Sequence, residues 1–253
     1  MQANILVYQD YVHNNDLLLR VLKPYGNVGG CDAADIVNGI LTGKVGLFVM
    51  PGGADLYYCE KLNGAGNSII RRYVETGGSY LGICAGAYYA CTDIEWAKGT
   101  DQEISGPREL GFAKGIAKGP VYEFLESGDI NKSWHHAAPI HFDDGTESFD
   151  TLVSYRAGPL LPEFGKVLAR YDRGPAIIEC SVGNGLAILS SPHIEHIGPA
   201  PESGLYKNLN LSFAHEKSVC DRLAPHTESQ SRLWARIIGR LMYAPSEKAR
   251  DAA

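Results

Sequence analysis

The chain has 253 residues, of which 45% are hydrophobic and 21% are charged, as is typical of a soluble globular protein with a substantial buried core. Its formal net charge of −6 at pH 7 argues against anionic partners such as nucleic acid and acidic membrane surfaces. No apolar run approaches the ~20 residues that a membrane-spanning helix needs. We therefore predict a single domain, residues 1–253, that binds neither nucleic acid nor membrane.

The spacing of the cysteines indicates the cellular compartment of the protein. The chain has six cysteines without Cys-x-x-Cys spacing, namely Cys31, Cys59, Cys84, Cys91, Cys180 and Cys220. In a chain of this length, such scatter indicates reduced thiols rather than a disulfide framework. The first eight residues lack the positively charged region of a signal peptide. We therefore expect a cytoplasmic protein.

Strand and helix patterns alternate along the first third of the chain. Short apolar runs predict strands, and helical spacing with turn residues predicts the helices between them. The expected strands are 5–8, 28–32, 45–50 and 80–83; the expected helices are 16–22, 35–41, 68–76 and 85–92, with 54–67 as a loop. This alternation predicts an α/β fold: a flavodoxin-like, doubly wound, mainly parallel sheet with helices on both faces and ligands at its carboxyl edge.

The rest of the chain begins with a stretch that six glycines interrupt between residues 99 and 128, for which we predict a β-rich excursion rather than a second domain. Beyond it, Gly183 to Gly185 read as a hairpin turn, and residues 229–242 form an amphipathic helix pattern. We expect a loop over 198–225 with a short helix near 215–222. Further strands are predicted at 115–122, 137–142, 151–155, 167–171, 176–181 and 185–190.

Residues 77–90 carry the strongest chemical signal. The run Gly-Ile-Cys-Ala-Gly follows a short apolar strand and opens a helix, with Cys84 at the joint and Gly82 and Gly86 on either side. This is the pattern of a nucleophile elbow, where a reactive side chain stands on a tight strand-to-helix turn. The alternative is a buried structural cysteine before a helix.

A candidate base follows the predicted strand 185–190, in the sequence Pro192-His193-Ile194-Glu195. Residues two apart on an extended chain point to the same side, so His193 and Glu195 would face together and Ile194 away. A carboxylate there fixes the imidazole tautomer while the other ring nitrogen faces a nucleophile. On the same reasoning His196 would face away from Glu195, which makes His193 the preferred base.

These motifs carry a family resemblance. Pro51-Gly52-Gly53, the elbow around Cys84, Tyr155 to Pro159 and His193-Ile-Glu195 resemble the class I glutamine amidotransferase superfamily. Within it, the chain is most similar to the amidotransferase-like N-terminal domain of eukaryotic-type biotin–protein ligases, a resemblance that does not imply biotin transfer. Many glutamine-using members carry a His-Gln pair after the elbow glycine, whereas this chain has Ala87-Tyr88-Tyr89, so glutamine recognition stays open.

The resemblance implies an oxyanion site beside the elbow. Acyl transfer needs backbone N–H donors aimed at the developing oxyanion. The amide of Ala85 would supply one donor, and Gly52 or Gly53, on the loop where the superfamily places its second donor, would supply the other. Tyr88, Tyr155 and Gly158 lie near the elbow or in the Tyr155–Pro159 motif, and they are the candidate substrate contacts.

A metal or cofactor is not expected. His135, His136, His141, Asp143 and Asp144 are close in sequence, but their spacing matches no helical zinc pattern. We read these residues as solvated or capping groups.

The motifs together predict an amidase or glutaminase-type hydrolase with a Cys84–His193–Glu195 triad and an acyl-thioester intermediate. Its substrate would be a small amide or a glutamine-like molecule, and a protein partner could receive the ammonia. Two alternatives stay open. One is a non-catalytic binding or regulatory module that keeps the fold; the other is a redox protein whose exposed thiol is oxidised.

Overall fold

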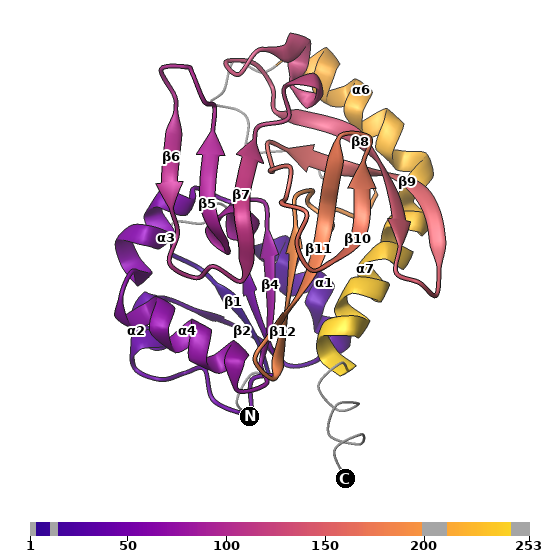
Figure 1. Cartoon of the computed structure of the whole chain (residues 1–253). Helices are drawn as coiled ribbons and strands as arrows, with labels where there is room; N and C mark the ends of the chain where they lie inside the picture. Colours follow the sequence, from indigo (N-terminus) through magenta and orange to yellow (C-terminus); the bar gives the residue numbers. More distant parts are fainter. Residues whose placement is uncertain (1–3, 11–14, 199–211, 244–253) are drawn as a thin grey trace.

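The computed structural model describes residues 4–10, 15–198 and 212–243. Its centre is a nine-stranded mixed sheet (Figure 1). Counted across the sheet, the five strands at one side pair in parallel, and all remaining neighbouring pairs are antiparallel. In spatial order the strands are β2 (Val28–Cys31), β1 (Ile5–Tyr8), β3 (Leu47–Met50), β4 (Ser79–Ile83), β12 (Gly185–Ser190), β11 (Gly174–Val182), β10 (Lys166–Tyr171), β8 (His135–Asp143) and β9 (Ser148–Arg156).

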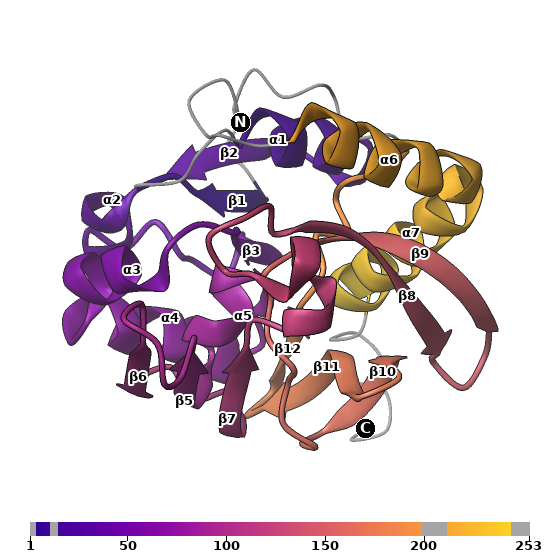
Figure 2. The same ribbon diagram turned by 90° about the horizontal axis from the view of Figure 1, so that it is seen from above.

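Both faces of the parallel half are covered by helices (Figure 2). On β1, Ile5 and Val7 pack with residues of the first and last helices, whereas Leu6 and Tyr8 join the opposite core. This alternation is the period-2 pattern of a strand. One face carries α1 (Asp16–Leu22) and α7 (Thr227–Tyr243), and the other carries α2 (Ala33–Val37), α3 (Asp55–Leu62), α4 (Ala65–Glu75) and α5 (Ala85–Tyr89).

The predicted α/β architecture is confirmed, and each predicted strand has a counterpart, but the strands Cys91–Trp96 and Ile104–Pro107 were not predicted and the one expected at 115–122 is Ala113–Gly119.

Three helix predictions need correction, and the first is the helix expected at 35–41, which spans Ala33–Val37. The segment expected as a loop over 54–67 contains α3 and the start of α4. Tyr58 and Leu62 of α3 are both buried, and their spacing of four residues places them on one helical face. The helix after the elbow ends at Tyr89 rather than near position 92, because Cys91 already belongs to the next strand.

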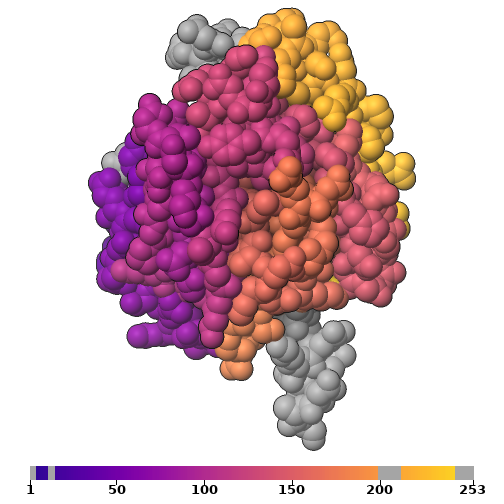
Figure 3. Space-filling view, turned by 45° about the horizontal axis from the view of Figure 1, so that its top comes forward, coloured from indigo at the N-terminus to yellow at the C-terminus, as the bar shows by residue number. Residues whose placement is uncertain are grey.

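The middle third forms the predicted β-rich excursion. It is a separate three-stranded sheet of β6 (Ile104–Pro107), β5 (Cys91–Trp96) and β7 (Ala113–Gly119). In Figure 3 this segment, purple to magenta, lies directly beside the orange strands of the main sheet. An isolated backbone bridge joins Lys118 of β7 to Leu160 in the loop between β9 and β10 of the main sheet. The three-stranded sheet therefore lies along one side of the region at the carboxyl ends of the parallel strands.

The C-terminal helices complete the covering layer. The helix predicted at 215–222 is longer, since α6 spans Phe213–Leu223, while residues 199–211 of the expected loop lie outside the described residues. The amphipathic pattern at 229–242 is confirmed as α7, whose Leu233, Ile237 and Leu241 are fully buried. Within the described ranges, no helix has both the length and the apolar character needed to cross a bilayer.

Candidate active site

Cys84 stands at a sharp turn between β4 and α5. Its backbone has φ 50° and ψ −105°, a conformation that non-glycine residues rarely adopt and that marks strained functional turns. The flanking glycines are required by packing. A Cβ on Gly82 would lie 2.5 Å from the carbonyl oxygen of Gly86, and one on Gly86 would lie 2.1 Å from that of Met50. The sequence thus allows strand, turn and helix to approach closely enough to form the elbow.

The sheet brings His193 to the same edge. β12 pairs in parallel with β4, so both strands end together, and the amide of Cys84 donates to the carbonyl oxygen of Ser190 at 2.8 Å. Beyond β12, the amide of His193 donates to the carbonyl of Ser154 at 2.8 Å. Cys84 is close enough to the His193 ring to contribute to its raised pKa, and Sγ of Cys84 donates to the carbonyl of Arg156 at 3.4 Å. Two segments more than one hundred residues apart therefore meet at one sulfur.

Glu195 holds the other side of the ring. Its Oε1 lies 2.6 Å from Nδ1 of His193; Glu195 is buried and His193 is partly buried. Burial opposes charge on His193, but Glu195 and Cys84 outweigh this effect and raise the pKa of His193 to about 10. Burial likewise opposes charge on Glu195, but His193 and His196 lower the pKa of its carboxyl. The pair is therefore an imidazolium–carboxylate pair at neutral pH.

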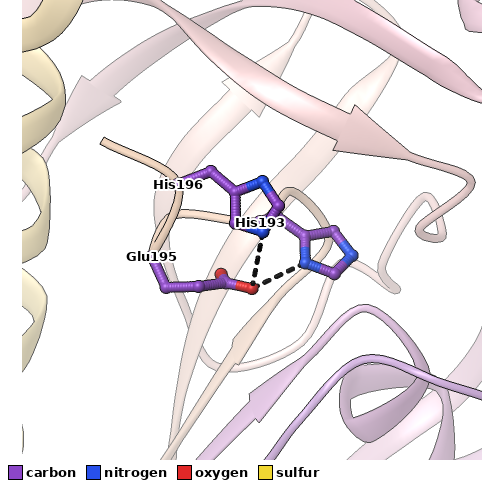
Figure 4. Close-up of side chains that lie close together, drawn as sticks. All are labelled: His193, Glu195 and His196. Carbon is purple, nitrogen blue, oxygen red and sulfur yellow. Dashed lines mark hydrogen bonds and ion pairs between the residues drawn. The ribbon is translucent and has the colours of Figure 1, made fainter. Parts of the chain in front are cut away.

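His196 departs from the predicted orientation. Its Nε2 lies 3.7 Å from the same Oε1 of Glu195, and its ring centroid is 5.1 Å from that of His193 (Figure 4). The prediction that it faces away from Glu195 is wrong, because the chain turns after Ile194 instead of continuing as a strand. Both rings thus converge on one carboxylate oxygen.

The backbone around Cys84 offers donors for an oxyanion. Gly53 and Ala85 line the cavity at the sulfur, and within the described residues their amides have no backbone acceptor. Gly52 lies closer to the base: a Cβ there would lie 2.5 Å from Cε1 of His193 and 3.5 Å from Cβ of Cys84. The structure gathers the three predicted oxyanion residues at the elbow, and their role stays a prediction.

A cavity of about 190 Å³ opens at Cys84. Its walls are mainly apolar, and they come from α3, from the three-stranded sheet and from the loops after β9 and before β8. Asp55 also lines it, but this carboxylate pairs with Arg108 at 2.6 Å. The apolar lining residues are Leu56, Ile94, Trp96, Ile104 and Trp134, and the basic one is Arg156.

The sequence prediction did not include most of this lining. Trp96 and Trp134 contact each other with ring centroids 5.4 Å apart, and Trp134 is 41% exposed. They are two of only three tryptophans in the chain, which is the one signal that could have drawn attention to them. Arg156 lies inside the Tyr155–Pro159 motif, where the prediction named its neighbours instead.

The candidate substrate contacts differ in position. Tyr88 lines the cavity, and its hydroxyl donates to the carbonyl of Ala157 at 3.1 Å. Tyr155 is fully buried behind the wall, where its hydroxyl donates to the carbonyl of Gly158 at 2.8 Å. Gly158 packs against Ser191, whose carbonyl oxygen would lie 2.0 Å from an added Cβ. These two residues support the Arg156–Ala157 segment, which does line the cavity.

The histidine-rich stretch does not gather into a metal site. His141 pairs with Asp150 at 2.8 Å on the surface, and Asp144 pairs with Arg236 of α7. Across residues 4–10, 15–198 and 212–243, the set with metal-ligand geometry is His193, Glu195 and His196, whose ligand atoms lie within 4.8 Å of one another. The 2.6 Å between Nδ1 of His193 and Oε1 of Glu195 suits a shared proton better than two bonds of about 2.0 Å to zinc at a tetrahedral angle.

A known protein family matches nearly the whole chain. The family described as "Biotin-protein ligase, N terminal" matches residues 4–251. The chain belongs to this family. The biotin-protein ligase N-terminal family is thereby confirmed as the branch that the motifs resemble, and membership concerns this region alone.

Two relatives match most of the chain. An uncharacterised protein of Chlamydia muridarum is 33% identical over an alignment of 207 residues, and the match covers 78% of this chain and 78% of that protein. A biotin–protein ligase of Schizosaccharomyces pombe is 27% identical over an alignment of 216 residues, and the match covers 76% of this chain and 33% of the ligase. This family member therefore spans about a third of that ligase.

A solved structure supports the fold. The structure of PurLQS from Thermotoga maritima superposes with a TM-score of 0.53 at 16% identity, over 78% of this chain and 89% of that one. This likeness supports the mixed α/β fold with its large central sheet. At this level of identity the likeness concerns the fold alone.

Proposed function

We propose that this member of the biotin-protein ligase N-terminal family is a cysteine-dependent amide hydrolase of the amidase or glutaminase type. The observation that carries the proposal is the meeting of a strained elbow cysteine with a buried histidine–carboxylate pair. A nucleophile, a base and a group that orients the base are the parts that acyl transfer requires.

The first half of the reaction forms a thioester. The proton that Cys84 and His193 share lies on Nε2 of His193, and the sulfur bonds to the amide carbon. The carbonyl oxygen becomes an oxyanion, which the amides of Gly53 and Ala85 stabilise. When this intermediate collapses, the carbon–nitrogen bond breaks, and the leaving amine takes the proton from Nε2. Glu195 keeps Nδ1–H of the ring in place throughout.

The second half regenerates the thiol. Water adds to the thioester carbon and gives one proton to Nε2 of His193. Collapse of this second intermediate breaks the carbon–sulfur bond and releases a carboxylic acid, and the Cys84–His193 pair is left with the one shared proton with which it began. The sum is amide plus water giving acid plus amine, or ammonia where the amide is primary. A protein partner could receive that ammonia.

The cavity favours a particular kind of amide. Its tryptophan and isoleucine walls suit an acyl group with apolar surface, because burial of such surface drives binding. After the elbow glycine, where many glutamine-using members carry a His-Gln pair, this chain has Ala87 and the buried Tyr88. A small amide with an apolar body is therefore the preferred substrate, and glutamine the less favoured one.

The test is a screen of activated esters and primary amides against the wild type, Cys84→Ala, Cys84→Ser and His193→Ala. We expect a thioester adduct on Cys84 by intact mass and turnover that Cys84→Ser and His193→Ala reduce by at least about a hundredfold. Cys59→Ala is the matched control, since this partly buried cysteine lies on α3 and should leave turnover unchanged.

The second candidate is a non-catalytic binding module. It is favoured by the finding that a related region occupies about a third of a longer ligase. If the wild type and Cys84→Ala are equally inert toward the whole screen, and both bind the same compound, the hydrolase proposal fails and the binding module replaces it.

A further inference from the structure

Aromatic side chains form a continuous row along one wall of the cavity at Cys84. Tyr88, Trp96 and Trp134 all line this cavity. The ring centroids of Tyr88 and Trp96 are 6.0 Å apart at an interplanar angle of 77°, and those of Trp96 and Trp134 are 5.4 Å apart at 69°. This edge-to-face arrangement is one that aromatic pairs prefer. An aromatic ring inside the cavity can therefore extend the row in the same geometry.

Trp134 is the most exposed ring of the row, and it is fixed in place. Its side chain is 41% exposed, its Nε1 donates to the carbonyl of Ile130 at 2.7 Å, and its ring packs against Trp96. Because the indole is held before any ligand arrives, little binding free energy is lost in ordering it. Trp134 therefore offers a preformed apolar contact surface at the cavity.

The size of the cavity suits one ring. An apolar protein cavity of about 150 Å³ holds benzene, and the cavity at Cys84 has a volume of about 190 Å³. The aliphatic side chains of Leu56, Ile94 and Ile104 contribute further lining. A six-membered ring on a short linker therefore fits between the row of aromatic side chains and the sulfur.

The charged groups that line the cavity have counter-charges within the protein. Asp55 forms an ion pair with Arg108 at 2.6 Å, and both side chains are mostly buried. Burial lowers the pKa of Arg156, and the carboxylates of Glu216 and Glu195 oppose this effect. A charged ligand would lose its hydration here and compete with these carboxylates and guanidinium groups for partners. A neutral ring is therefore favoured over a charged one.

The position of His193 indicates which part of a substrate enters the cavity. The leaving amine takes its proton from Nε2 of His193, so the amine must lie on the side of the sulfur where this ring is. Cys84, Gly53 and Ala85 line the cavity, but His193 and Glu195 are not among the described residues that do. The cavity therefore receives the acyl part of the amide.

We propose that the cavity binds a neutral aryl group on the acyl side of the reacting amide, as in a phenylacetyl group, and that Trp134 selects this group over an aliphatic one of the same size. The reaction of such an amide rests on the proposed hydrolase function, whereas binding of the ring does not. The expected preference is about two- to twelvefold, since an aromatic contact adds about 0.5–1.5 kcal/mol to the burial of area.

The direct test is ligand binding to the full chain with Cys84→Ala, which cannot form a thioester. Phenylacetamide and cyclohexylacetamide have the same number of heavy atoms, but only the first is aromatic. The three tryptophans give separate indole N–H signals by NMR. Those of Trp96 and Trp134 should shift during either titration, while that of Trp234, buried on α7, should not. Phenylacetamide should bind about two- to twelvefold more tightly.

Variants of Trp134 identify the source of the preference. Trp134→Leu should make the two affinities equal, whereas Trp134→Phe keeps a ring and should keep the preference. Tyr122→Leu is the matched control, because Tyr122 is a 39% exposed aromatic residue on the same connection before β8 and is not among the described lining residues. The proposal is overturned by equal affinities in the parent protein, by a preference that survives in Trp134→Leu, or by no binding of either amide up to its solubility limit.

Turnover by the wild type separates this inference from the hydrolase function. Phenylacetamide should have the larger kcat/KM by the same factor, mainly through a lower KM, because the ring is bound equally in the ground and transition states. N-benzylacetamide, with its ring on the amine side, should react no faster than N-(cyclohexylmethyl)acetamide. An aryl preference found only on the amine side would overturn the acyl-side assignment. Aryl-selective binding without turnover would leave the ring site standing and remove the hydrolase; turnover without aryl preference would do the reverse.

Discussion

Nδ1 of His193 lies 2.6 Å from Oε1 of Glu195, and the two side chains are 13% and 5% exposed. This contact fixes which ring nitrogen faces Cys84. Glu195→Gln should keep the shape but lose the charge that raises the pKa of His193. We expect turnover to fall by about a hundredfold, less than in His193→Ala, since the carboxylate orients the base without exchanging the proton. Steady-state kinetics from pH 6 to 9 will measure this loss. Equal rates in the variant and the wild type would remove Glu195 from the triad.

The cysteines should differ in reactivity. Burial is the main cause that raises the pKa of Cys31 and of Cys180, each to about 12, whereas Cys84 lines a cavity and contacts His193. Iodoacetamide near pH 7 should therefore modify Cys84 first, and the order can be read by peptide mass spectrometry after short exposures. His193→Ala should slow this labelling. Faster labelling of Cys59 or Cys220 would argue against an activated thiol at the elbow.

Most of the strand order could be anticipated because apolar runs of four to six residues alternate with helical patterns. The pair His193 and Glu195 was expected to meet on an extended segment; the structure brings the two side chains together, but across a turn at Ile194 and Glu195. His196 could not be placed, because the turn after Ile194 depends on the contact between His193 and Ser154 of β9. A partner strand forty residues away leaves no local pattern in the sequence.

The residues that line the cavity could not be predicted from the sequence for the same reason. Trp96 lies on β5 of the excursion and Trp134 in the loop before β8, and the two rings meet only in the folded chain. The helix α3 was missed because its apolar face contains only two fully buried positions, Tyr58 and Leu62. Long-range pairing decided these features, and local propensity did not.

The glycines of the elbow should tolerate no side chain. In Gly86→Ala the new Cβ would lie 2.1 Å from the carbonyl oxygen of Met50, so β3 and α5 would have to separate. We expect a loss of at least about 3 kcal/mol in the free energy of unfolding. Gly239→Ala is the matched control, because no atom lies within 4 Å of its added Cβ and the site is inside α7. That variant should gain about 0.5–1 kcal/mol. Urea unfolding will measure both, and a stable Gly86→Ala would contradict the close packing.

Asp144 should stabilise the packing of α7 against the β8–β9 hairpin. Its carboxylate accepts from Arg236 and from the amide of Thr146 at 2.9 Å. Burial opposes its charge, but these contacts outweigh burial and lower its pKa from 3.8 to about 2. A lowered pKa stabilises the folded state above the unfolded value, and this contribution is lost as the pH falls through the folded value. Asp144→Asn should therefore cost on the order of 2 kcal/mol at pH 7.

The pH dependence of that cost separates charge from shape. The difference in unfolding free energy between the wild type and Asp144→Asn should stay constant from pH 7 to about 5 and then shrink between 3.8 and 2. Urea titrations at several pH values will follow it. A difference that is independent of pH over the acid range would show that packing, and not the ion pair with Arg236, sets the cost.

Gly52 offers a way to disturb the base without touching a titratable group. A Cβ at this position would lie 2.5 Å from Cε1 and 3.1 Å from Nε2 of His193, so Gly52→Ala must push the imidazole away from Cys84. The ring is a side chain and can yield, which makes the cost in stability smaller than at Gly86. We expect turnover and the rate of Cys84 alkylation each to fall by about ten- to a hundredfold, since a misplacement near 1 Å is enough for such a loss. Urea unfolding should show a change below about 1.5 kcal/mol. The double variant Gly52→Ala with His193→Ala decides the cause: if the glycine acts through the histidine, the two losses will not add. Additive losses would mean that Gly52 acts on its own, through the oxyanion or the substrate.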